Sequence, residues 1–134
     1  MSGQPVEFST KMVEELDLHS FRDTHGVLIT TMNDVPGYKV DRVIGTVYGL
    51  VVRTRNIFST IGAGLKSLFG GELGALTQNL YLARNIAVER CTGEALARGA
   101  NAIIAMRYDN GTLNGTVSTE VCAYGTACII SKIE

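Results

Sequence analysis

The sequence predicts an α+β fold of two layers, in which one helical layer covers one face of a single sheet. Segments with the periodicity of strands and helices follow one another in the order strand, strand, helical region, strand, strand. This order supplies only one layer of helix to cover the sheet. Hydrophobic residues make up 46% of the 134 residues, which is more apolar surface than a small monomer easily buries. We therefore expect a partner subunit to cover the second face of the sheet.

The amino-terminal segment, residues 1–26, differs in composition from the rest of the chain. It holds both histidines, and its acidic residues outnumber its basic residues. Met12 and Leu16 recur at helical spacing, which predicts a short docked helix. His19 and His25 have no cysteine nearby, so solvated surface positions are favoured over metal ligation.

Two strands follow this segment. Residues 27–32 read "VLITTM", a run rich in β-branched side chains that predicts a short strand. The pair Pro36 and Gly37 then predicts a type II turn, because glycine accepts the positive φ that this turn requires. After the turn, residues 38–55 predict a longer strand that is apolar on both faces and therefore covered on both sides.

Two glycines in the longer strand, Gly45 and Gly49, point to the same face of the predicted sheet. A missing side chain at such positions permits either a β-bulge or the close approach of another backbone. The sequence leaves both interpretations open.

The stretch from Asn56 to Leu76, "NIFSTIGAGLKSLFGGELGAL", combines glycines and apolar residues around one Lys-Ser pair. A phosphate-binding loop needs a glycine directly before that pair, but Leu65 stands there. An interfacial membrane helix needs a basic face, and this stretch has a single lysine. We therefore expect a short helix that packs within or between subunits and ends at the Gly70–Gly71 break. Its predicted packing residues are Ile57, Phe58, Ile61, Leu65, Leu68 and Phe69.

A long helix is predicted over residues 72–98, with Gly99 as its C-terminal cap. Two strands follow at residues 101–109 and 117–133, joined by the turn-forming "NGTLNGT" at residues 110–116. The apolar stripe of the helix consists of Leu73, Leu76, Leu80, Ala83, Ala87, Cys91 and Ala95.

The weak candidates for soft-metal ligands are the three cysteines, Cys91, Cys122 and Cys128. Their odd number, without a secretory signal, favours reduced thiols. If the last strand is continuous, Cys122 and Cys128 share a face about 20 Å apart, beyond a shared metal ion or a disulfide. The simplest interpretation of each is a small buried hydrophobe. The alternative is a ring of ligands in which each subunit contributes one cysteine near a symmetry axis.

Several functional classes lack support in the sequence. No apolar run approaches the length that spans a bilayer, and the net charge of −1 gives no reason to expect a nucleic-acid partner. No nucleophile elbow, kinase motif set or dinucleotide fingerprint appears. We expect a cytoplasmic protein that is not an enzyme. Its cofactor is unknown, and a soft metal ion is the candidate.

Five motifs in order, "NDVPGYKV", "GTVYG", "AGLKSLFGGEL", "ARGANAIIAMRYD" and "EVCAYGTA", resemble the YbjQ-like family. The resemblance runs from about Val27 to Ile130, which leaves residues 1–26 as an extension before a YbjQ-like domain at 27–134. It implies a dodecin-like β-α-β-β subunit with an extra N-terminal strand, assembled as a ring, typically a homopentamer. Family members carry a heavy-metal-binding label, but the family motif has no cysteine or histidine to transfer onto this chain.

These observations lead to two functional expectations. The first is a homo-oligomeric binding protein that holds a heavy-metal ion or a small ligand in a channel or in clefts between subunits. The second is a structural or protein-interaction module with no metal or catalytic site.

Overall fold

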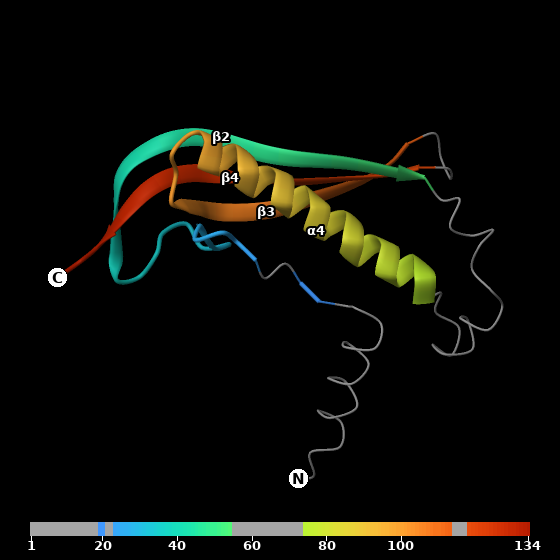
Figure 1. Cartoon of the computed structure of the whole chain (residues 1–134), viewed down its shortest axis with the longest axis horizontal. Coiled ribbons are helices and arrows are strands. Elements are labelled where there is room, and N and C mark those ends of the chain that lie inside the picture. Colours follow the sequence, from blue (N-terminus) through green and yellow to red (C-terminus); the bar gives the residue numbers. More distant parts are fainter. Residues whose placement is uncertain (1–18, 21–22, 55–73, 114–117) are drawn as a thin grey trace, which may run out of the picture.

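The computed structural model describes residues 19–20, 23–54, 74–113 and 118–134, and these form one helix packed on one face of a mixed sheet (Figure 1). The strands are in the spatial order β1-β3-β4-β2. β1 is parallel to β3, whereas the β3–β4 and β4–β2 pairs are antiparallel. The predicted α+β fold is confirmed for this part of the chain. Its elements are β1 (Leu28–Ile29), β2 (Tyr38–Thr54), α4 (Gly74–Ala97), β3 (Ala102–Leu113) and β4 (Ser118–Lys132).

The first strand is shorter than the sequence predicts, because only Leu28–Ile29 of the expected residues 27–32 form a ladder with β3. A bulge in β3 ends this pairing. Ala105 has a φ of 55°, and the amides of the bulge then donate hydrogen bonds to an irregular segment instead of to a strand. These bonds run from Ala105 N to Met32 O and from Met106 N to Thr30 O.

The predicted turn before β2 is confirmed. Tyr38 N donates a hydrogen bond of 2.9 Å to Val35 O, and Gly37 has a φ of 85°, as a type II turn requires. The C-terminal cap of α4 is confirmed as well. Gly99 has a φ of 84°, and Ala100 N donates to Ala95 O at 2.9 Å.

Within one chain β2 is covered on one side only, and cover of its second side by a partner subunit stays a prediction. Val47 and Val51 are 1% and 6% exposed beneath α4, but Tyr48 and Leu50, on the opposite face, are 63% and 42% exposed. The reason is the number of layers: α4 covers one face of the sheet, and the described residues include no second helix for the other.

The apolar stripe of α4 is confirmed from Ala83 to Ala95. Ala83, Ala87, Cys91 and Ala95 are 0–2% exposed in the main core. At Leu80 the prediction is wrong, because this side chain is 36% exposed. Figure 1 shows the cause, since the N-terminal half of α4 diverges from the sheet.

The two β2 glycines have separate roles. A Cβ on Gly49 would lie 2.5 Å from Cys91 N and would also overlap Ala87 O, so the missing side chain allows α4 to approach β2 closely. Gly45 has a φ of 140° and lies at a register shift that begins at Val43, so it belongs to a β-bulge. Each interpretation that the sequence left open therefore holds at one glycine.

A second, smaller cluster of buried residues lies on the sheet face that α4 does not cover. It consists of Ala102, Cys128 and Ile130, with Leu28, Val35, Tyr38 and Ile104 packed against it. The turn segment before β2 therefore covers one end of this face. β3 extends through Leu113, so the residues Asn110–Leu113 that were expected in a turn are strand instead.

Several predicted features lie outside the described residues. They are the helical pattern up to Leu16, the six packing residues of the segment from Ile57 to Phe69, and the break at Gly70–Gly71. Leu73 and the side chain of Leu76, at the start of the predicted stripe, lie outside them as well. Within the described ranges, no helix is long and apolar enough to span a membrane.

Candidate functional site

The three cysteines are free thiols that the fold places in different surroundings. Cys91 is buried on α4 in the main core, and Cys128 is buried in the smaller cluster on the other face of the sheet. Cys122 is half-buried, and because Val121 and Ala123 face α4, it points to the opposite face. No described group of three His, Cys, Asp or Glu side chains could hold a metal ion.

The environment of each thiol favours its neutral form. Burial, reinforced by Cys122 and Glu94, raises the pKa of Cys91 from 9.0 to about 11. Burial also raises the pKa of Cys122, with Asp109 and Glu120 adding to the shift. Metal ions bind thiolates, so a single subunit offers no activated thiol to a soft metal.

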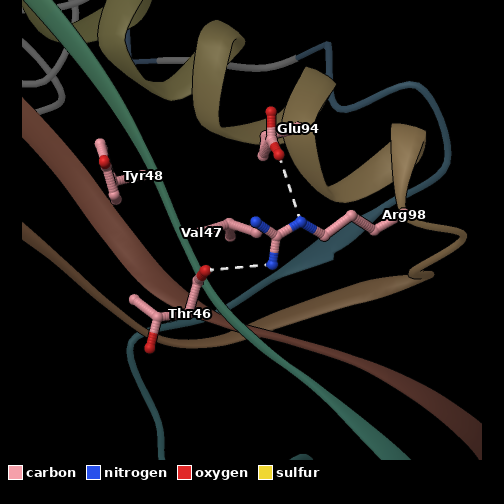
Figure 2. A pocket seen from close by; sticks show the side chains of 5 residues that line it. All are labelled: Thr46, Val47, Tyr48, Glu94 and Arg98. Atoms are coloured by element: carbon pink, nitrogen blue, oxygen red, sulfur yellow. Dashed lines mark hydrogen bonds and ion pairs between the residues drawn. The ribbon is translucent and has the colours of Figure 1, made fainter.

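A polar pocket of about 200 Å³ lies at the outer edge of β2, where Arg98 reaches across from α4 (Figure 2). Arg98 Nε donates to Glu94 Oε2 at 3.2 Å, and Arg98 Nη1 donates to Thr46 O at 3.5 Å. Val47 and Tyr48 complete the described lining. Because Glu94 neutralises the arginine, the pocket offers no net charge to a ligand.

Arg98 and a second arginine of α4, Arg90, both bind the main chain of the edge strand β2. Arg90, two helical turns before Arg98, donates from Nη1 to Leu50 O at 2.6 Å. Thr46 and Leu50 are four residues apart on β2, so their carbonyls leave the same edge of the strand. Two arginines of α4 thus occupy main-chain acceptors that could otherwise pair with a strand of another chain.

The uncovered sheet face carries an apolar surface that we call the open face, defined by Tyr48, Leu50, Val52, Cys122 and Tyr124. Tyr48 pairs directly with Tyr124, and Leu50 pairs with Cys122. The exposed fractions are 63% for Tyr48, 51% for Val52 and 39% for Tyr124. Exposed large side chains in neighbouring cross-strand pairs mark an interaction surface.

Charged residues of both signs border the open face. Arg107 pairs with Tyr124, and Asp109 pairs with Cys122 on the same face. Glu120 pairs with Val52 at the other end of the face. A border with both signs allows another copy of the chain to approach without a net like-charge repulsion.

Sequence patterns did not indicate the arginine contacts or the open face as a continuous surface. The apolar residues of β2 signalled that both faces would be covered, but not which face its own helix would occupy. No sequence pattern predicted the contacts of Arg90 and Arg98, because each contact joins residues at least 40 positions apart.

The chain is similar to a family described as "Putative heavy-metal-binding", the YbjQ-like proteins, whose model matches residues 27–131. A UPF0145 protein of Acidothermus cellulolyticus is 54% identical over 80% of this chain and 98% of its own length. A UPF0145 protein of Streptomyces griseus is 59% identical over 80% of this chain and 88% of its own. Neither name specifies an activity.

A solved structure supports the fold. A protein of unknown function from Pediococcus pentosaceus, assigned to the DUF74 family, superposes with a TM-score of 0.52 at 17% identity. The match covers 79% of this chain and 99% of that one. At this identity the likeness concerns the fold alone.

Proposed function

Since the chain belongs to the YbjQ-like family described as "Putative heavy-metal-binding", we propose that it is a non-catalytic binding protein that works as a homo-oligomer. Residues 27–134 form the assembling domain, and residues 1–26 are an extension. Each subunit packs its open face against a different surface of the next subunit, and these contacts close a ring, with five members as the family resemblance implies. The ring holds a small ligand rather than acting on one.

The observation that carries this proposal is the exposure of the open face. Tyr48, Leu50 and Val52 leave 42–63% of their surface exposed along one strand of a small domain. Burying apolar surface contributes about 25 cal/mol per Å², so covering this face with a second copy is strongly favoured. The arginines on the edge of β2 direct that association toward the face of the sheet, because they occupy acceptors on its edge.

Replacing one residue of the open face with a cation tests the assembly. We expect Leu50→Lys to yield smaller species in sedimentation velocity, because association would bury an unpaired ammonium group at a cost of several kcal/mol. Leu82→Lys is the matched control. Leu82 is 47% exposed on α4, away from the open face, and its variant should sediment as the wild type does. A monomeric wild type, or an unchanged Leu50→Lys profile, would refute this interface.

A soft-metal site shared between subunits is a second candidate function. It is favoured by the position of Cys122, which lies on the open face directly opposite Asp109. Cys91 and Cys128 are buried in separate clusters. Only Cys122 among the three therefore lies on the surface where copies would meet.

Metal analysis of protein purified without an affinity tag and exposed to Zn²⁺ tests this candidate. If subunits share a site, Cys122→Ala should abolish stoichiometric zinc, whereas Cys128→Ala should retain it. A metal-free wild-type oligomer would eliminate the shared site and favour small-ligand binding. A ring that retained neither metal nor ligand would favour the interaction-module alternative.

A further inference from the structure

A second cavity lies on the α4 side of the sheet, between the N-terminal half of α4 and the outer part of β3. Its volume is about 430 Å³, within the range of small-molecule sites. The bulge at Ala105 positions one wall, because after it Tyr108 pairs with Ala123, which faces α4. The divergence of α4 from the sheet leaves the cavity open. The described lining includes Leu80, Tyr81, Arg84, Asn85, Tyr108 and Asn110.

Arg84 gives this cavity a positive charge. It is the only charged side chain in the described lining, and it forms no ion pair with any residue that the structure describes. Its guanidinium carbon lies 5.2 Å from the centroid of the Tyr108 ring. Among the described residues, no hydrogen bond or ion pair uses the N–H donors of Arg84, so they stay available for an anion. Arg98 differs in this respect, because its charge is neutralised by Glu94.

The other walls are aromatic, apolar or neutral. Tyr81 and Tyr108 are 37% and 43% exposed, and Leu80 adds an aliphatic surface. Asn85 Nδ2 donates to His19 O at 2.8 Å, which anchors the chain beside the cavity. An available cation beside two aromatic rings matches a ligand with a planar apolar body and one carboxylate.

We propose that this cavity binds a small aromatic carboxylate, with the carboxylate paired to Arg84 and the ring packed against Tyr81 and Tyr108. This inference rests on the proposed function, because it names the ligand class that the binding protein takes. It assigns the site to the α4 side of the sheet, not to the open face. Ligand binding and assembly are therefore separable by mutation.

Titration of the full-length protein with 2-naphthoate tests the site. The chain contains no tryptophan, so ligand fluorescence excited beyond the tyrosine band reports binding without interference. We expect saturable binding by the wild type and about tenfold weaker binding by Arg84→Gln, through loss of a charge-assisted hydrogen bond. Arg42→Gln is the matched control, since Arg42 is exposed on β2 outside the cavity, and its affinity should be unchanged.

Two further comparisons separate charge from ring packing. The neutral analogue 2-naphthamide should bind the wild type about tenfold more weakly than 2-naphthoate, and Arg84→Gln should not change its affinity. Tyr108→Leu should weaken both ligands, whereas Tyr108→Phe should retain both, because it keeps the ring. Inorganic phosphate that displaced 2-naphthoate at constant ionic strength with equal affinity would overturn the aromatic part of the proposal.

The proposal fails if the wild type shows no saturable binding, or if Arg84→Gln and Arg42→Gln weaken binding equally. Sedimentation of the same samples distinguishes this failure from failure of the proposed function. An intact oligomer without 2-naphthoate binding overturns the ligand class alone. A monomer that binds 2-naphthoate overturns the assembly and leaves the cavity site in place.

Discussion

At Gly49 the backbones of β2 and α4 approach so closely that no side chain fits between them. A Cβ there would overlap Ala87 O and lie 2.5 Å from Cys91 N, both of which belong to the helix main chain. Main-chain atoms cannot rotate away as the end of a flexible side chain can. The small residues of the α4 stripe also allow this close approach, because the side chains of Ala83, Ala87 and Ala95 are short.

We expect Gly49→Ala to lower the free energy of unfolding by about 3 kcal/mol, because α4 must move away from the sheet to admit the methyl group. Gly93→Ala is the matched control within α4. A Cβ on Gly93 meets nothing within 4 Å, so the change should stabilise the protein by about 0.5–1 kcal/mol through helix propensity. Urea denaturation of both variants measures these effects. Equal stability of the two variants would contradict the close contact at Gly49.

At the scale of elements, β2 is the longest described strand and lies at an edge of the sheet. Such an edge exposes main-chain donors and acceptors to other chains. Two arginines of α4, Arg90 and Arg98, protect this edge, because they donate hydrogen bonds to the Leu50 and Thr46 carbonyls. One helix thus covers the core face of the sheet and also protects the edge of its outermost strand.

Removing the shorter of these two contacts should expose the edge. We expect Arg90→Met to destabilise the protein by roughly 1 kcal/mol, because it loses a charge-assisted hydrogen bond in a solvent-exposed position. It should also increase aggregation during heating, measured by light scattering. Arg42→Met serves as the control on an exposed arginine of β2, and it should change neither property. Unaltered scattering by Arg90→Met would show that the arginine contact does not protect the edge.

At the scale of the whole molecule, the two faces of the sheet differ in what covers them. α4 covers one face, while the turn segment before β2 covers one end of the other, over Ala102 and Cys128. The remaining area is the open face, which we propose as the assembly surface. The Arg84 cavity lies on the α4 side of the sheet. Assembly and ligand binding would therefore use opposite sides of one thin domain.

Much of the fold could be predicted from the sequence, because its signals are local. The type II turn at Pro36–Gly37 and the cap at Gly99 depend on the φ that glycine permits. The order of strands and helix follows from residue periodicity. The length of the first strand could not be predicted, because it depends on a bulge at Ala105, in a strand more than 70 residues later.

The candidate site was less predictable than the fold. Cys122 and Cys128 were expected on one face of a continuous strand, and the structure places them there, one half-buried and the other buried. Arg84 carried no distinguishing signal, because its importance depends on a ring 24 residues away on another element. The packing residues from Ile57 to Phe69 remain a prediction, since they lie outside the described residues.

The sequence by itself determined the order of elements, their periodicities, the turn and cap glycines, and an excess of apolar surface that one small domain does not bury. Each of these depends on neighbouring residues or on composition alone. Only the tertiary structure decided which face of β2 stays open, which carbonyls the arginines reach, and where a cation meets aromatic rings. Those features depend on register, bulges and helix placement, which bring together residues far apart in the chain.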